Sequence, residues 1–128
     1  MRLLLDTHVL LWLLIEPARL GAPFRKEVED PANEVFFSVA SVWEMAIKAS
    51  LGRANFGAAP ETIVDAALAD GFTELPVRSA AALKVASLPL LHRDPFDRLL
   101  VAQAMTEPAV LYTADDVLLN YSDLVVRV

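Results

Sequence analysis

Cysteine is absent from the 128-residue chain. Its absence excludes a disulfide framework, a thiolate metal site and a cysteine nucleophile. Any metal ion held by the protein must therefore use oxygen or histidine ligands. A chain without cysteine also fits a reducing compartment, so we expect a cytoplasmic protein.

Glycine is scarce, with four residues, and no glycine-rich phosphate loop occurs in the sequence. The G-x-S-x-G pattern of serine hydrolases is missing as well. Readings of the chain as a nucleotide-cofactor enzyme or a serine hydrolase therefore have no support.

Positive charge is in deficit, because 11 Lys and Arg stand against 17 Asp and Glu, which gives a formal net charge of −6. An enzyme with this balance that acts on nucleic acid must depend on a local basic patch and on bound cations. Such a patch has four candidate residues, each of which also fits an ordinary solvated surface. They are Lys48, Arg53, Arg93 and Arg98.

A hydrophobic run long enough to cross a membrane is also missing. The longest apolar stretch, residues 3–15, is too short and is interrupted by Asp6 and His8. We interpret it as core and expect no membrane partner. The hydrophobic fraction is 55% and the length suits one compact unit, so we expect a single domain over residues 1–128.

Strand-like and helix-like segments alternate along the chain. Apolar, β-rich runs predict strands over residues 2–5, 34–38, 72–75, 109–113 and 124–126. Helical spacing and end signals predict helices from Asp6 to residue 15 and over residues 24–30, 39–51, 61–69, 79–87, 95–105 and 115–120. Alternation of this kind implies parallel βαβ units with the sheet buried on both faces. We predict an α/β fold, a three-layer α/β/α sandwich around a mainly parallel sheet of four to five strands.

Four acidic residues fall where such a fold would build a site. Asp6 ends the first strand, Asp115 follows the fourth, and Glu44 and Asp97 lie on helices entered from the same edge. Ligands of open α/β sheets bind beyond the carboxyl ends of the strands. Three or four carboxylates there can hold Mg²⁺ or a similar hard cation, an arrangement suited to phosphodiester hydrolysis.

Each acid also has a structural explanation. Asp94 before Pro95 predicts a helix N-cap, which places Asp97 in the first turn, where a carboxylate favours the helix dipole. Ser41 and Glu44 have the S-x-x-E spacing of a capping box, although the predicted helix starts before them. Asp115 fits a cap of the short helix after it. Asp6 is hardest to explain structurally, because a carboxylate that ends a buried strand needs a partner. Because all four acids are predicted at the same edge of the sheet, together they favour the interpretation as a metal site.

Other conspicuous residues favour structural roles. We interpret His8 and His92 as ordinary, partly buried or loop histidines, and Trp12 and Trp43 as core side chains because they lie at helical spacing with Leu and Ile. Gln103, among apolar neighbours, is expected to satisfy a local hydrogen bond.

Several segments resemble PIN domains of the VapC type, the toxins of toxin-antitoxin pairs. They are L-L-L-D-T-H-V-L-L-W at 3–12, S-V-W-E at 41–44, H-R-D-P-F-D-R-L-L-V-A-Q-A at 92–104 and Y-T-A-D-D at 112–116. The resemblance spans almost the whole chain, in order. It carries the family's metal-binding acids onto Asp6, Glu44, Asp97 and Asp115, with Thr113 as the associated hydroxyl and Asp116 as an alternative to Asp115.

This resemblance implies an endoribonuclease dependent on Mg²⁺ or Mn²⁺ that cleaves RNA with metal-activated water. It further implies a homodimer inhibited by a cognate antitoxin protein. Two alternatives stay open, a PIN nuclease that is not a toxin and a PIN module that binds without catalysis. A phosphoacceptor receiver and a dehalogenase-like phosphatase fit less well. The first would want adjacent acids at the first strand, and the second would want D-x-D where this chain has D-T-H.

Overall fold

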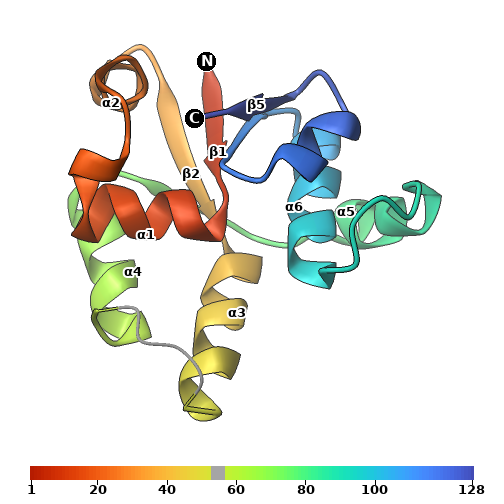
Figure 1. Cartoon of the computed structure of the whole chain (residues 1–128), viewed down its shortest axis with the longest axis horizontal. Helices are drawn as coiled ribbons and strands as arrows, with labels where there is room; N and C mark the ends of the chain where they lie inside the picture. Colours follow the sequence, from red (N-terminus) through yellow and green to blue (C-terminus); the bar gives the residue numbers. More distant parts are fainter. Residues whose placement is uncertain (53–56) are drawn as a thin grey trace.

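A central sheet of five parallel strands organises the chain (Figure 1). The computed structural model describes residues 1–52 and 57–128. The strand order is β3-β2-β1-β4-β5. The strands are β1 (Arg2–Leu5), β2 (Glu34–Ser38), β3 (Thr73–Leu75), β4 (Val110–Thr113) and β5 (Val125–Arg127). The predicted α/β class and parallel sheet are confirmed.

Helices cover both faces of the sheet. They are α1 (Thr7–Ile15), α2 (Ala22–Glu29), α3 (Val39–Ser50), α4 (Pro60–Ala69), α5 (Ser79–Lys84) and α6 (Pro95–Thr106). Short 3-10 turns are η1 (Pro17–Arg19), η2 (Val85–Ser87) and η3 (Asp116–Asn120). Figure 1 shows α1, α2 and α4 on one side of β1 and β2, with α5 and α6 on the other.

Alternation along β1 divides the core into two parts. Leu3 and Leu5 pack with residues of α1, α2 and α4, whereas Leu4 packs with residues of α6 and η3. Successive side chains of a strand point to opposite faces, so these two clusters are the two interfaces of a three-layer sandwich. The apolar character of all three leucines follows from burial of both faces, as the sequence predicted.

Most differences from the predicted elements lie at their ends. Helix α2 begins at Ala22 rather than residue 24, because Pro23 suits the first turn of a helix. The predicted helix 79–87 is α5 followed by the 3-10 turn η2. The 3-10 turn η1 was not predicted from the sequence. Gly71 follows α4 with a φ of +87°, a left-handed conformation for which glycine was the expected residue.

The strand order sets the place of the site. From β1 the chain moves outward through β2 to β3, then crosses back to β4 on the other side of β1. The order therefore reverses between β1 and β4, and the carboxyl ends of these strands form the crevice where ligands bind in open α/β folds. Asp6 follows β1 directly, and Asp115 lies two residues beyond β4.

Candidate metal centre

Asp6 is a buried acid at this edge, with 4% of its surface exposed. Its Oδ1 accepts a hydrogen bond from the backbone N–H of Val9 at 2.8 Å, which caps α1. Its Oδ2 accepts a hydrogen bond from the Thr113 hydroxyl at 2.5 Å. Burial raises the pKa of Asp6, and these hydrogen bonds oppose the shift. The carboxylate is thus fixed in place while its charge is poorly solvated.

Asp97 lies in the first turn of α6, as predicted. Asp94 caps this helix, since its Oδ1 accepts from the backbone N–H of Phe96 at 2.8 Å, and its predicted capping role is confirmed. Burial raises the pKa of Asp97 to about 7, and the charges of Asp94, Asp6 and Glu44 add to the shift. A carboxyl with this pKa sits among uncompensated negative charge.

Asp115 and Asp116 have different surroundings. Asp115 Oδ1 caps η3 by accepting from the Val117 N–H, and its Oδ2 lies 2.8 Å from His92 Nε2. The Thr113 hydroxyl accepts from the Asp115 N–H at 3.0 Å, so Thr113 links Asp115 to Asp6. Asp116 instead pairs with Arg127 at the surface. The geometry therefore favours Asp115 over Asp116 as the fourth acid.

Glu44 is buried, but both of its oxygens already have partners. Oε1 accepts from the Thr7 hydroxyl at 2.7 Å, and Oε2 is 2.7 Å from Lys48 Nζ, one helical turn away. Ser38, which accepts from the Ala40 N–H, caps α3, so Ser41 and Glu44 form no capping box. The charge of Glu44 still reaches Asp97 and raises its pKa. Glu44 thus borders the cluster with its carboxylate oriented by Thr7 and Lys48.

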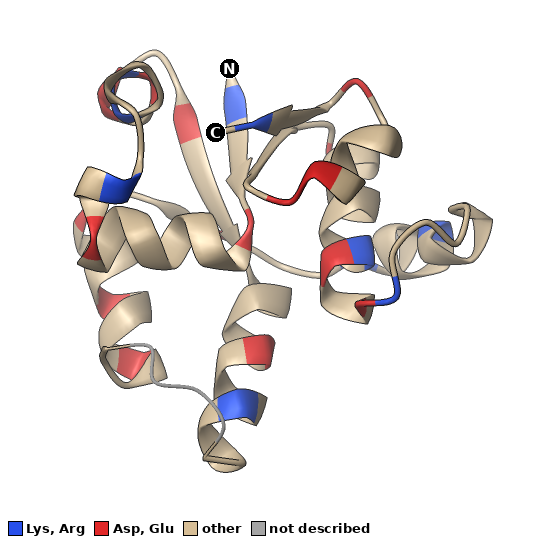
Figure 2. Ribbon diagram, viewed as in Figure 1, with Lys and Arg blue, Asp and Glu red and all other residues tan. Residues whose placement is uncertain are grey.

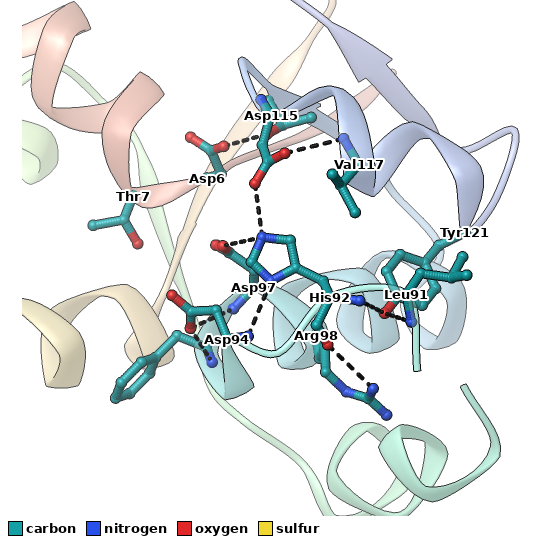
Figure 3. A network of polar contacts seen from close by, with 12 residues as sticks. Asp6, Thr7, Leu91, His92, Asp94, Asp97, Arg98, Asp115, Val117 and Tyr121 are labelled. Atoms are coloured by element: carbon teal, nitrogen blue, oxygen red, sulfur yellow. Dashed lines mark hydrogen bonds and ion pairs between the residues drawn. The ribbon is translucent and has the colours of Figure 1, made fainter. Parts of the chain in front are cut away.

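His92 joins the cluster, which the sequence analysis did not predict. Figure 3 shows its ring between Asp115 and Asp97, with Nε2 2.8 Å from Asp115 Oδ2 and 3.6 Å from Asp97 Oδ2. The backbone N–H groups of Leu91 and His92 both donate to the Tyr121 hydroxyl, which holds the loop in place. The sequence did indicate that His92 lies near the cluster, because His92 stands only two residues before Asp94, the predicted cap of the helix that carries Asp97.

A cavity of about 310 Å³ opens at the cluster. Its lining residues are Asp6, His8, Trp12, Asp97, Ala114 and Asp115. Three of the four predicted acids therefore face one space, and the fourth, Glu44, lies beside it. Trp12 is partly buried against the first core cluster, as predicted. His8 instead lies exposed on α1 and lines the cavity, so it is neither the partly buried nor the loop histidine that was predicted.

The basic candidates have unequal surroundings. Lys48 pairs with Glu44. Arg98 is directed to backbone carbonyls, including those of Val85 and His92, so it braces the loop instead of offering its charge to a ligand. Arg93 is exposed on the loop beside His92. Arg53 lies outside the described residues. Figure 2 shows Lys and Arg dispersed over several elements, with no basic stripe on the described chain.

Two further predicted structural roles are wrong. Trp43 is 59% exposed and not a core residue, and its ring meets Phe96 edge-on at 5.3 Å between centroids. Gln103 is buried, but its hydrogen bond is not local, because its Oε1 accepts from the Ser38 hydroxyl of a different element. In both cases the helical spacing was correct, and the neighbours across the fold decided the environment.

The donor set fits a hard divalent cation. Asp6, Asp97 and Asp115 offer carboxylate oxygens to one cavity, and no Lys or Arg of the described chain forms an ion pair with any of them. A buried carboxylate without a cationic partner is costly, and Mg²⁺ or Mn²⁺ would relieve that cost. Burial raises the pKa of Asp6, and burial together with the charges of Asp94, Asp6 and Glu44 raises the pKa of Asp97.

Comparisons with known proteins agree with this fold. The family model described as "PIN domain" matches residues 3–124. No curated protein is similar enough in sequence to count as a match. No described helix has the length and apolar character needed to cross a membrane.

Three solved structures are similar in fold. VapBC2 from Rickettsia felis, bound to a DNA fragment from its promoter, has a TM-score of 0.71 at 12% identity, with coverage of 100% of this chain and 98% of that chain. VapBC-1 from nontypeable Haemophilus influenzae has a TM-score of 0.61 at 20% identity, covering 90% and 87%. PAE2754 from Pyrobaculum aerophilum has a TM-score of 0.59 at 20% identity, covering 99% and 83%. At these identities the similarity shows the fold alone.

Proposed function

The chain belongs to the PIN domain family, and from this premise we propose that it is a metal-dependent endoribonuclease and the toxin of a toxin-antitoxin pair. The observation that supports the chemistry best is the convergence of Asp6, Asp97 and Asp115 on one cavity without a cationic partner among the described Lys and Arg. A PIN module that binds without catalysis would gain nothing from buried carboxylates that destabilise its fold.

In this proposal the acids of the cluster bind the cation, and their neighbours orient them. Asp6, Asp97 and Asp115 hold Mg²⁺ or Mn²⁺. When bound, such a cation lowers the pKa of a water molecule and stabilises charge on a phosphate. Thr113 fixes the carboxylate of Asp6 through its hydroxyl. Glu44, oriented by Thr7 and Lys48, adds negative charge beside the cation or accepts a hydrogen bond from its water.

Cleavage of single-stranded RNA should therefore require a divalent cation. We expect the purified protein to cleave a labelled RNA with Mg²⁺ or Mn²⁺ and to lose all cleavage with excess EDTA, because only the cation can supply the nucleophile. The Asp6→Asn variant, purified identically, controls for a contaminating nuclease and should be inactive. Cleavage that survives chelation, or an active Asp6→Asn variant, would contradict the proposal.

Two neighbouring acids, Asp115 and Asp116, allow a matched test of the ligand at this position. Asp115→Asn should reduce cleavage roughly 10- to 100-fold, a typical cost of disturbing a metal site. Asp116→Asn makes the same chemical change one residue later, in a surface pair with Arg127, and should leave the rate unchanged. Initial rates at saturating Mn²⁺ compare the two variants. The opposite ranking would transfer the role to Asp116.

RNA is the proposed substrate in part because an exposed aromatic ring borders the cluster. Trp43 precedes Glu44, and the Phe96 ring that supports it precedes Asp97. An exposed ring in this position can stack an unpaired base, which contributes about 1 to 3 kcal/mol per base. Trp43→Ala should then raise KM for single-stranded RNA roughly 10-fold and leave kcat nearly constant. Leu83→Ala on α5, which removes another exposed apolar side chain, should change neither.

Partners follow from the family and from the similar structures. Two of those structures are VapBC assemblies, which supports a partner protein that neutralises the nuclease. We propose a cognate antitoxin that inserts a basic segment into the acidic cavity, and a homodimer of the nuclease itself. Copurification of the chain with the product of an adjacent reading frame, followed by loss of RNA cleavage, tests the first. Light scattering at micromolar concentration tests the second.

A further inference from the structure

His92, Asp97 and Asp115 together have the composition of a metal-binding triad. One ligand atom from each lies within 4.8 Å of the others. An imidazole ligand beside two carboxylates would favour Mn²⁺ and later transition metals over Mg²⁺. Whether His92 is a ligand therefore bears directly on the proposed metal chemistry.

The hydrogen bond on the other side of the ring answers this question. The backbone N–H of Asp94 donates to His92 Nδ1 at 3.0 Å. A backbone amide can only donate, so Nδ1 must be the unprotonated nitrogen, and in a neutral imidazole the proton then resides on Nε2. Nε2 is the nitrogen that faces the cluster (Figure 3). It presents an N–H there, and a metal needs a lone pair.

Hydrogen bonds on both sides of His92 fix the backbone that carries its ring. The Tyr121 hydroxyl accepts from the N–H groups of Leu91 and His92 at 3.1 and 2.9 Å, and Arg98 reaches the His92 carbonyl. The Asp94 amide that sets the tautomer belongs to the residue that caps α6. The tautomer that offers the Nε2 lone pair carries its proton on Nδ1, and this N–H would then face the Asp94 amide, donor to donor.

We propose that His92 is a positioning residue that orients Asp115, and that it does not ligate the cation. Its Nε2–H donates to Asp115 Oδ2 at 2.8 Å, while the Asp115 Oδ1 caps η3. Hydrogen bonds thereby fix both carboxylate oxygens of Asp115, which lines the cavity. The proposal rests on the metal site proposed above, and it assigns that site an all-oxygen donor set.

The tautomer itself provides the first test, and it needs no catalytic activity. The chain has two histidines, His8 and His92, so long-range proton–nitrogen spectra are simple to assign, with His8→Asn as the reference. At pH 8 we expect His92 to carry its proton on Nε2, and to keep it there when Mg²⁺ is added. Transfer of the proton to Nδ1, in metal-free protein or on Mg²⁺ addition, would overturn the proposal.

A pair of variants provides the second test. In His92→Gln the side-chain amide nitrogen reaches the place of Nε2 and can still donate to Asp115, whereas His92→Asn reaches only the place of Nδ1. We expect His92→Asn to weaken Mn²⁺ binding in calorimetry by roughly 10- to 100-fold, and His92→Gln to retain affinity within a few-fold of the parent. Equal losses in the two variants would contradict positioning by a donor.

Mn²⁺ also reports its own ligands. Pulsed electron paramagnetic resonance detects the nitrogen of a directly bound imidazole, and we expect no such coupling in the Mn²⁺ complex. A strong nitrogen coupling that disappears in His92→Gln would make His92 a ligand. All three measurements can be read in a protein that cleaves no RNA, so failure of this inference and failure of the proposed nuclease activity remain distinguishable.

Discussion

Asp97→Asn is expected to make the metal-free protein more stable near pH 8 while RNA cleavage collapses. The two effects share one cause, because the negative charge of Asp97 that would bind a cation destabilises the fold when no cation is bound. The pKa of Asp97 is about 7 in the fold, against 3.8 for an ordinary Asp, since the side chain is desolvated and faces the charges of Asp94, Asp6 and Glu44.

The direction of the pH effect follows from this shift. The folded protein holds the Asp97 proton more tightly than the unfolded chain does, so the free energy of unfolding falls as the pH rises from about 4 through 7. Above pH 7 the loss is complete. Asparagine cannot ionise, and the variant should therefore lack this decline.

Two opposing terms decide the size of the gain. Loss of the carboxylate from the first turn of α6 costs about 0.3 to 1 kcal/mol of helix-dipole stabilisation. Relief of the raised pKa contributes more, roughly 1 to 3 kcal/mol once partial solvent screening of the 21% exposed side chain is allowed for. The gain from removing the desolvated charge exceeds the lost helix-dipole stabilisation, so the variant should be the more stable protein near pH 8.

Urea melts in EDTA at several pH values, paired with RNA cleavage at saturating Mn²⁺, measure both effects. Cleavage should fall roughly 100-fold or more, because Asp97 is a proposed ligand. Asp116→Asn is the matched control, since its carboxylate is exposed and paired with Arg127, and it should change neither quantity appreciably. A destabilised but active Asp97→Asn variant would leave Asp97 with only its helix-terminal role.

The strand-end acids were predictable from sequence because their position depends on local order. Parallel strands put their carboxyl ends at one edge, so a carboxylate directly after a buried strand, such as Asp6, must lie in the crevice. The same logic found Asp97 and Asp115 once the helix and strand boundaries were approximately right. Errors of one or two residues at element ends did not move these side chains to another face.

The environments of Glu44, His92 and Trp43 were not predictable in this way. Helical spacing shows which face of α3 Trp43 and Glu44 occupy, but not what packs against them. Glu44 finds Thr7 from α1, and Trp43 meets Phe96 from α6. His92 is placed by Tyr121, 29 residues further along the chain. Contacts between distant elements carry no periodic signal, so loop and helix residues at a site need the fold before they can be interpreted.

Mn²⁺ is expected to reverse the pH dependence of stability. Without a cation, ionisation of Asp97 lowers the free energy of unfolding as the pH rises through 7. With a cation the same ionisation is required, because a ligand carboxylate must lose its proton before it can bind, so affinity increases over this range. The carboxylate that destabilises the metal-free protein then becomes the group that stabilises the complex.

The expected size comes from linkage. A ligand at 100 times its Kd that binds only the folded state adds about 2.7 kcal/mol to the free energy of unfolding. Near pH 5, where Asp97 is protonated, the same Mn²⁺ concentration should add much less. The difference between melts in Mn²⁺ and in EDTA should therefore be small in acid and grow through pH 7. It should be nearly flat in Asp97→Asn, whose weakened site gains little at either pH. If Mn²⁺ stabilised the parent equally at pH 5 and pH 8, Asp97 would not be a ligand, and the cation would bind elsewhere on the acidic surface.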